Sequence, residues 1–389
     1  MIHPKYYQLK KQQEKLIKRK NKINKDLYNG IYERYLHPVV TRNHVPLEWR
    51  FDLALKTNPH FLERLMVNTT FNSGAIYFDG YHYLVVRLEG ADRKSIFALA
   101  KSKSGIDNFR FLRLLEWEDK DKEEVNRYDM RLTTHEDGYI YGVYCAERKD
   151  TKVDDTSSAK AWIGMVKTKD LINWERLPNL ETDSEQQRNA VLHPEFVNGK
   201  YAFYTRPQDK FMDVGSGGGI FFGYVKDMKN PVIEDERLVF GKNYHTIYEY
   251  KNGQGPAPIK TAKGWLHLVH GVRETAAGLR YVLYMFATDL NDLTKVIARP
   301  SGHFMAPLGK ERVGDVSNVL FVNGWSIDGN KVFIYYASSD TRMHVATTTI
   351  EKLEDYVFNT PTEVYRAHDS TKQRNELINK NKKLLEDNK

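Results

Sequence analysis

Residues 78–87 read FDGYHYLVVR, a turn glycine followed by a strand of alternating aromatic and aliphatic side chains. The same pattern returns as HEDGYIYGVY at 135–144, VNGKYAFYTR at 197–206, TAKGWLHLVH at 261–270 and IDGNKVFIYY at 327–336. Asp-Gly and Asn-Gly dipeptides in this setting are typical of tight hairpin turns, which need positive φ angles. The turn glycines recur about every 58 to 65 residues, and such regular spacing indicates a repeat architecture.

A second similar stretch, called the echo below, follows each copy and predicts a further strand and turn. The five echoes lie at 98–109, 164–177, 223–233, 285–297 and 345–357. Units of this length match four-stranded blades, which bury their faces against each other around a central axis and leave only short edges. The chain is therefore predicted to be all-β, a five-bladed β-propeller over residues 68–358.

Helical segments are expected on both sides of the propeller. Residues 1–67 are predicted to be an N-terminal helical extension and lead-in, and residues 359–389 a C-terminal helical extension. Loose apolar stripes at helical spacing run through 4–28 and 370–388, with Ser370 as the expected helix cap. Such a stripe packs either on its own chain or on a second subunit, and we expect a homo-oligomer formed through these helices.

The composition argues against membrane and nucleic-acid partners. Much of the net charge of +8 lies in a lysine-rich run at 10–25, and the remaining chain mixes both signs without an RNA- or DNA-binding motif. No apolar run approaches the ~20 residues of a membrane span, and the N-terminus lacks the apolar stretch of a signal peptide. A single cysteine, Cys145, excludes an internal disulfide. We expect a cytoplasmic protein.

Asp129 is the first candidate for chemistry. It directly precedes a predicted strand and is flanked by Tyr128 and Arg131. A carboxylate beside arginines is often a plain ion pair, and cationic neighbours lower the pKa that a general acid needs to be high. A bound anion that neutralised those cations would remove the objection. From the residues alone, both interpretations stay open.

Cationic side chains recur at the ends of the repeat strands. Arg87 and Arg93 follow the first repeat strand, and Arg148 closes the second. Arg188 opens the third repeat and Arg206 closes it, while His270 and Arg273 close the fourth. Each could pair with a neighbouring carboxylate, but several converging at the mouth of a propeller would bind a phosphate, whose oxygens suit the guanidinium fork. The sequence holds neither an HExxH motif nor clustered Cys and His residues, so no metal site is predicted.

Four further blocks of sequence stand out beyond the repeats. They are YDMRL at 128–132, RNAVLHPE at 188–195, GQGPAPI at 253–259 and GDVSNV at 314–319. In this order the blocks resemble glycoside hydrolase family 130. The similarity covers nearly the whole chain, and additional matching blocks lie at 28–35 and 335–342. The family fold is a five-bladed propeller, which agrees with the repeat count.

The resemblance implies an inverting glycoside phosphorylase, an enzyme of the hexosyltransferase type. It would reversibly convert 4-O-β-D-mannosyl-D-glucose and inorganic phosphate to α-D-mannose 1-phosphate and D-glucose. The resemblance assigns the general acid to Asp129, acting through the 3-hydroxyl of the mannosyl residue. Inverting hydrolysis ordinarily uses a second carboxylate to activate water, whereas phosphate is already an anionic nucleophile held by cations. The implied partners are a disaccharide and phosphate, and no cofactor is expected.

Matching motif positions imply two sets of binding residues near Asp129. Those expected to hold the mannosyl unit are Asn72, Ser73, Arg87, Tyr128 and Asp315. Those expected to bind phosphate are Arg148, Arg188, Lys251, His270 and Tyr284.

Other functions remain open at this point. A phosphorylase of longer β-1,4-mannooligosaccharides would differ in the loops around the acceptor. A β-mannoside hydrolase would need a second carboxylate as base, and Asp315 or Glu195 would be the suspects. A non-catalytic sugar-binding propeller would need neither Asp129 nor the arginines. A nucleic-acid scaffold would bind through the lysine-rich N-terminus with a strong salt dependence.

Overall fold

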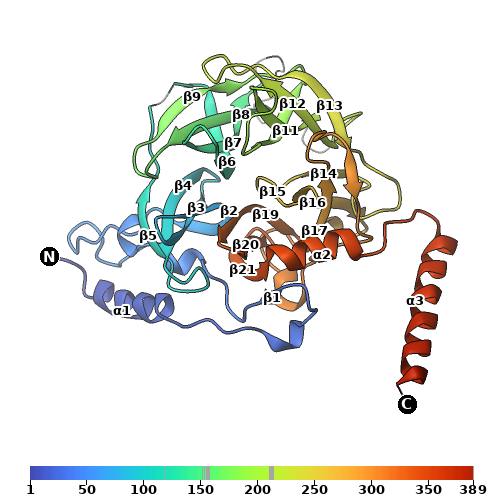
Figure 1. The fold of residues 1–389 in the computed structure, drawn as a ribbon. Helices are drawn as coiled ribbons and strands as arrows, with labels where there is room; N and C mark the ends of the chain where they lie inside the picture. The colour runs from blue at the N-terminus through green and yellow to red at the C-terminus, as the bar shows by residue number, and fades with distance from the viewer. Residues whose placement is uncertain (119, 151, 153, 155–157, 210–213, 389) are drawn as a thin grey trace.

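Five antiparallel sheets stand around a central axis as the blades of a propeller (Figure 1). The computed structural model describes residues 1–118, 120–150, 152, 154, 158–209 and 214–388. The five-bladed, all-β architecture expected from the repeats is confirmed.

Within a blade the strands follow one another in chain order, and the first strands of neighbouring blades meet at the axis. Blade one comprises β2 (Val67–Phe78), β3 (Tyr81–Gly90), β4 (Ser95–Ser102) and β5 (Arg110–Leu114). Blade two comprises β6 (Glu124–Thr134), β7 (Ile140–Lys149), β8 (Ala159–Thr168) and β9 (Glu175–Leu180). Blade three comprises β10 (Gln186–Leu192), β11 (Tyr201–Gln208), β12 (Ile220–Val225) and β13 (Glu234–Phe240).

The last two blades depart from the simple order. Blade four comprises β14 (Lys251–Gln254), β15 (Ile259–Lys260), β16 (Trp265–Thr275), β17 (Gly278–Thr288) and β18 (Val296–Ala298), with β15 paired to β16. Blade five comprises β19 (Leu320–Asp328), β20 (Lys331–Ser338), β21 (Arg342–Thr349) and β1 (Glu33–Arg34). Single-turn 3-10 helices are η1 (Lys25–Leu27), η2 (Arg42–His44), η3 (Leu47–Trp49) and η4 (Gly309–Arg312).

The repeat quoted from the sequence is the second strand of every blade, namely β3, β7, β11, β16 and β20. In blade one the hairpin closes with Phe78 opposite Tyr81. Its two turn residues, Asp79 and Gly80, have φ angles of 46° and 71°, as a type I′ turn requires. The dipeptide signal therefore predicted the right turn for a physical reason.

Blade five is completed by the N-terminal part of the chain. Residues 345–357 are predicted to form a strand and a turn; the first part lies in β21, but the chain then forms the helix α2 (Ile350–Asn359). The outermost strand is instead β1, which pairs with β21 through Arg34 opposite Ala346. The segment expected to be a helical lead-in thus also closes the ring, because it supplies the strand that the fifth repeat lacks.

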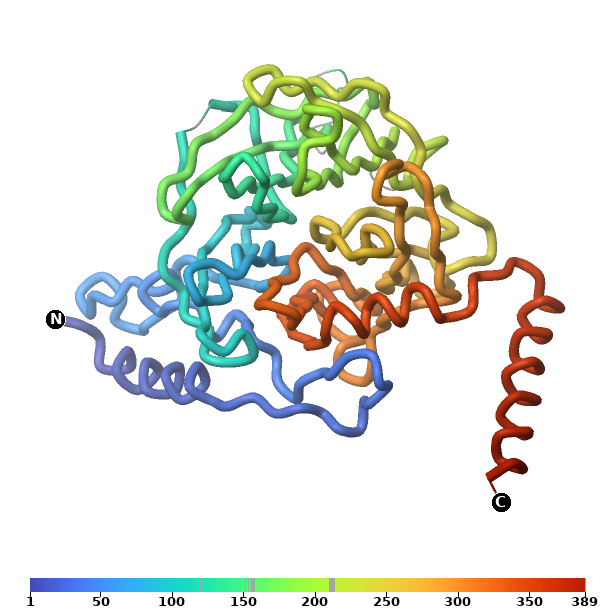
Figure 2. The backbone as a smooth tube through the Cα atoms, in the orientation of Figure 1, coloured from blue at the N-terminus to red at the C-terminus, as the bar shows by residue number. Residues whose placement is uncertain are grey.

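The terminal helices are shorter or placed differently than the sequence indicated. The stripe through 4–28 becomes α1 (Lys5–Ile17), followed by non-helical chain and η1. The C-terminal helix α3 (Ala367–Asp387) begins before Ser370, which lies inside its first turn rather than at its cap. Figures 1 and 2 show α3 pointing away from the propeller. Among the described residues, no helix is long and apolar enough to cross a membrane.

The hydrophobic core is divided into layers between neighbouring blades. Successive residues of β3 face opposite sides, so Val85 packs in the layer shared with blade two and Val86 in the layer shared with blade five. Both faces of the repeat strands are therefore buried, which explains why these strands are apolar at nearly every position.

The first strands of the blades approach one another closely at the axis. A Cβ atom at Gly324 of β19 would lie 2.3 Å from the backbone nitrogen of Ala75 in β2. Both partners belong to central strands, so neither backbone can give way cheaply.

We expect Gly324→Ala to lower the free energy of unfolding by about 3 kcal/mol because the added methyl group forces two blades apart. Chemical denaturation would measure the loss. Gly241→Ala is the matched control, since its Cβ would meet only Leu238 Cδ2 at 3.5 Å. Equal effects of the two substitutions would contradict the close-packing argument.

Candidate active site

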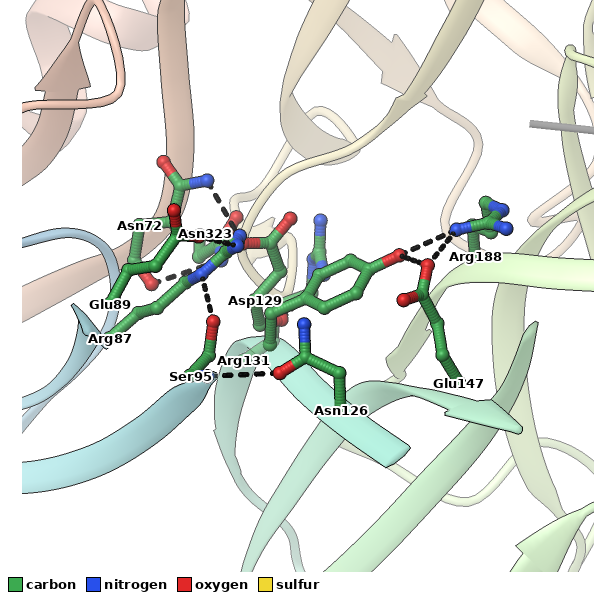
Figure 3. Close-up of polar contacts among 11 residues, drawn as sticks. Asn72, Arg87, Glu89, Ser95, Asn126, Asp129, Arg131, Glu147, Arg188 and Asn323 are labelled. Atoms are coloured by element: carbon green, nitrogen blue, oxygen red, sulfur yellow. Dashed lines mark hydrogen bonds and ion pairs between the residues drawn. The ribbon is translucent and has the colours of Figure 1, made fainter. Parts of the chain in front are cut away.

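A cavity of about 680 Å³ opens where the first strands of the blades meet. It brings together seven of the residues that the resemblance assigned to acid catalysis, sugar binding or phosphate binding: Asn72, Arg87, Tyr128, Asp129, Arg188, Lys251 and Asp315. Figure 3 shows Asp129 between Arg87 on one side and the pair of Glu147 and Arg188 on the other. All five blades therefore contribute residues to this one cavity.

Irregularities in the first strands aim polar side chains into this region. The strand register shifts at Asn72 in β2, at Asp129 in β6, at Arg188 in β10 and at Asn323 in β19. Asn72 and Asp129 also adopt left-handed backbone conformations, with φ angles of 46° and 59°. A β-bulge inserts a residue and redirects side chains, and such strain is typical of functional positions.

Asp129 is held by one amide and one guanidinium group. Its Oδ1 accepts hydrogen bonds from Asn72 Nδ2 at 2.9 Å and from Arg87 Nη1 at 3.1 Å (Figure 3). Arg87 in turn donates to Glu89 Oε2 at 2.8 Å and Ser95 Oγ at 3.0 Å. Its guanidinium also stacks over Phe71, 4.3 Å from the ring centroid. These contacts fix the carboxylate at one end of the cavity.

More carboxylates gather at this end of the cavity. Asp315 and Asp340 line it together with Glu89. Burial raises the pKa of Asp340 to about 7, although the positive charge of Arg87 opposes the rise. The negative charges of Asp129 and Glu89 add to it. Near neutral pH, Asp340 can therefore donate or accept a hydrogen bond, which suits the hydroxyl groups of a sugar.

The opposite end of the cavity is cationic. Arg188 donates from Nη1 to Glu147 Oε1 at 2.5 Å and to the Tyr128 hydroxyl at 2.6 Å. The Tyr128 hydroxyl donates to the same Glu147 oxygen at 2.8 Å. Arg206 and Lys251 line this end as well, and both side chains are buried. Burial, together with the charges of Arg206 and Arg188, lowers the pKa of Lys251 to about 7.

Hydrogen bonds between blades support the floor beneath both ends. Arg131 Nε donates to the Gly255 carbonyl at 3.1 Å, linking blade two to blade four. Asn189 Nδ2 donates to the Gln254 carbonyl at 2.9 Å, and Asn323 Nδ2 to the Asn72 carbonyl at 3.3 Å. The floor of the site is thus built on mutually bonded strands, while Asp315 and Asp340 reach the cavity from connections between strands.

Comparison with known proteins decides the family. The family model described as β-1,4-mannooligosaccharide phosphorylase, glycoside hydrolase family 130, matches residues 39–358. The chain belongs to glycoside hydrolase family 130. A 4-O-β-D-mannosyl-D-glucose phosphorylase of Bacteroides fragilis is 56% identical to it over 381 residues, covering 96% of each chain.

More distant relatives match the chain in sequence or in fold. A β-1,4-mannooligosaccharide phosphorylase of Ruminococcus albus is 30% identical over 75% of this chain and 85% of that protein. The solved β-1,2-mannobiose phosphorylase of Listeria innocua, in complex with β-1,2-mannobiose, superposes with a TM-score of 0.68. It is 21% identical and covers 85% of this chain and 99% of that one, a likeness that shows the fold.

One phosphate residue expected in this family 130 chain lies elsewhere. Arg148 donates to Asp121 Oδ2 at 2.6 Å, stacks over Trp162 and lines a separate cleft between blades two and three. Its neighbour Glu147 faces the central cavity. Because successive residues of a strand face opposite sides, Arg148 cannot point the same way.

Three other expected residues lie near the cavity without lining it. Tyr284 is buried between blades three and four, where its hydroxyl accepts a hydrogen bond from Asn252 Nδ2 at 3.0 Å. His270 is fully buried, and its Nε2 lies 2.9 Å from Arg206 Nη1, so it supports that arginine from behind. Ser73 shares the bulge with Asn72 and is fully buried, and its Oγ has no hydrogen-bond partner among the described residues.

Sequence reasoning missed several residues of this family 130 cavity as site members. They are Glu89, Glu147, Tyr281 and Asp340. Arg206 was among the cations noted at the repeat strands, but not among the residues that the resemblance assigned to phosphate. A signal existed for Glu89, which follows Arg87 by one alternation of the same strand and so shares its face. Asp340 lies in a turn, where the alternation of a strand cannot predict which way a side chain points. Glu195, a suspected hydrolytic base, pairs with Lys260 at 2.6 Å outside the cavity.

Proposed function

We propose that this protein is a glycoside phosphorylase that acts reversibly on 4-O-β-D-mannosyl-D-glucose and phosphate. The single observation that carries the proposal is the polarity of one cavity, with Asp129 at one end and Arg188, Arg206 and Lys251 at the other. The relative from Bacteroides fragilis, 56% identical over 96% of the chain, supports the choice of sugar.

The mannosyl unit would lie at the carboxylate end of the cavity. Asn72 and Arg87 orient the Asp129 carboxyl group, while Asp315 and Asp340 face the sugar hydroxyls. Asp129 gives its proton, through the mannosyl 3-hydroxyl, to the oxygen that leaves with glucose. A phosphate oxygen forms the new bond to the anomeric carbon from the opposite face as the glycosidic bond breaks. Inversion yields α-D-mannose 1-phosphate and D-glucose.

The distribution of charge favours phosphate over water as the nucleophile. A hydrolase needs a carboxylate that is free to take a proton from water. Glu147, the carboxylate at the cationic end, is ion-paired to Arg188 and accepts a hydrogen bond from Tyr128. Guanidinium and ammonium groups suit a phosphate dianion, whose charge they neutralise.

Product analysis tests this proposal directly. The protein is incubated with 4-O-β-D-mannosyl-D-glucose, with and without inorganic phosphate. We expect α-D-mannose 1-phosphate and glucose only when phosphate is present. Free mannose formed without phosphate would establish a hydrolase instead. Parallel assays with β-1,4-mannobiose and mannotriose test the mannooligosaccharide phosphorylase, the activity that the family description names.

The proposal predicts a pH-dependent contribution from Lys251. With a pKa of about 7, this group is half protonated near neutrality and loses its charge as the pH rises further. Only the charged form attracts phosphate, so Lys251→Met should raise the KM for phosphate about tenfold at pH 6 and hardly at all at pH 9. The variant-to-wild-type ratio at each pH cancels the titration of phosphate itself. A ratio that stays constant across this range would contradict the role of Lys251.

A homo-oligomer formed through α3 is also proposed. Helix α1 is engaged by its own chain, since Gln13 donates to the Val45 carbonyl and Glu14 pairs with Arg110. Helix α3 has no buried residue among the described ones, and Leu377 and Leu384 are about half exposed. We expect light scattering to show an oligomer for the wild type and a smaller species for Leu377→Ser/Leu384→Ser. Unchanged mass would exclude α3 as the contact.

We further propose a cytoplasmic location and no cofactor beyond phosphate as co-substrate. Burial raises the pKa of the Cys145 thiol to about 12, so the group stays protonated and inert in β7. Within the described ranges, no three His, Cys, Asp or Glu side chains are placed to hold a metal ion. Phosphorolysis is expected to be unchanged after dialysis against a chelator.

A further inference from the structure

A further cleft, separate from the central cavity and from the cleft around Arg148, lies beside the hairpin formed by β16 and β17. Its volume is about 390 Å³, and Arg273, Arg280, His245, His303, Glu249 and Glu363 line it. Small-molecule sites typically occupy about 300 to 1,000 Å³, so the cleft is large enough for a phosphorylated monosaccharide. None of these six residues lines the central cavity.

Two arginines stand directly opposite each other in this cleft. The register of the hairpin pairs Arg273 with Arg280. Neither side chain makes a hydrogen bond or ion pair with any residue in the described part of the chain, and the Nε of Arg280 is buried without a partner. Like charges directly across a strand pair are destabilising, and a buried unpaired donor adds to the cost. A bound anion between the two guanidinium groups would remove both penalties.

The rest of the cleft suits hydroxyl groups rather than more negative charge. Glu363 accepts a hydrogen bond from the Tyr248 hydroxyl, and Glu249 accepts one from the backbone of His245 at 2.9 Å. The cation that acts on the Glu363 carboxylate is Arg299, which lies outside the lining of the cleft, rather than Arg273 or Arg280. Carboxylate and imidazole groups are hydrogen-bonding partners for sugar hydroxyls, whereas the arginines suit a phosphate group.

We propose that this cleft is a second, non-catalytic binding site for a hexose phosphate, with Arg273 and Arg280 holding the phosphate group. The site shares a strand with the central cavity. Along β17, Leu279 and Tyr281 line the central cavity, while Arg280 and Val282 line the cleft. An anion bound in the cleft therefore contacts the side of β17 that faces away from the central cavity and holds this strand in place.

Isothermal titration calorimetry with α-D-mannose 1-phosphate tests the proposal, and this choice of probe rests on the proposed function. We expect two sites per wild-type chain. Arg273→Gln/Arg280→Gln should lose one of them through an affinity loss of about 100-fold, because two charge-assisted contacts disappear. The exposed Arg113 lies in blade one, and Arg113→Gln should retain both sites. A single site in the wild type, or two undiminished sites in the double variant, would overturn the proposal.

Further measurements separate the possible causes of each result. Retained turnover shows that the double variant is folded, and Arg273→Gln alone should weaken the same site if the pair does not fold. Titration with inorganic phosphate alone should give at least about tenfold weaker binding at this site, since the sugar contacts are missing. Equal affinity would overturn the assignment to a hexose phosphate. Absence of phosphorolysis would refute the proposed function and leave the calorimetric result on the cleft intact.

Discussion

Replacing Asp129 with asparagine is expected to lower the rate of phosphorolysis by about 10²- to 10⁴-fold, the range for loss of a general acid. The substitution removes the proton but preserves the shape. Asparagine tolerates the left-handed backbone that residue 129 adopts, and its amide can still meet Asn72. The thermal midpoint should therefore change little. Initial rates of α-D-mannose 1-phosphate release measure the effect.

The leaving group provides the sharper test of Asp129. In a β-mannoside of 4-nitrophenol, the nitrophenolate leaves without being protonated. The rate of Asp129→Asn on this substrate should therefore be close to the wild-type rate. A structural role would slow both substrates equally. Glu195→Gln is the matched control, because that carboxylate is paired with Lys260 outside the cavity and should leave the rate unchanged. Equal impairment by both substitutions would refute the assignment.

Replacing Arg188 with glutamine is expected to raise the KM for phosphate about 10- to 100-fold while the KM for the disaccharide stays nearly constant. The weaker affinity for phosphate has two causes. A charge-assisted contact to phosphate disappears, and Glu147 is left without its ion-pair partner at the cationic end of the cavity. Steady-state kinetics with each substrate varied in turn separates the two constants.

A double variant separates these two contributions to the KM for phosphate. Adding Glu147→Gln to Arg188→Gln removes the unpaired negative charge, so the KM for phosphate should partly recover. The Tyr128 hydroxyl can still donate to the glutamine oxygen, which keeps the local geometry. No recovery would mean that Glu147 exerts no repulsion on the anion. A raised KM for the disaccharide instead of phosphate would place Arg188 on the sugar.

The residues at the carboxylate end of the cavity were predicted from the sequence more completely than those at the cationic end. Asp129, Asn72 and Arg87 lie in or beside the β-bulges, and hydrogen bonds from Asn72 and Arg87 join them to Asp129. Asp129 lies inside the YDMRL block, and Arg87 ends the first repeat. On the cationic side, the repeat strands offered both Arg148 and Arg206; the family resemblance favoured Arg148, but only Arg206 lines the cavity. Both are arginines near the end of a second strand, and only the direction of the side chain separates them. A bulge or a change of register reverses that direction without changing the composition.

The terminal segments show the same limit. An apolar stripe at helical spacing indicated a helix over 4–28, but it could not indicate that Glu33 and Arg34 pair with β21 to complete blade five. Pairing between segments so far apart in the chain depends on the closed ring, which no local pattern describes.

By itself the sequence determined the number of blades, the hairpin in each, and the buried apolar faces, since turn chemistry and strand alternation are local and repeat along the chain. It also determined the residue types available for acid chemistry and anion binding. Only the tertiary structure decided which of those residues meet. Five first strands converge on one axis, and four of them, β2, β6, β10 and β19, carry a bulge. The face on which a side chain lies depends on register and ring closure rather than on its neighbours in sequence.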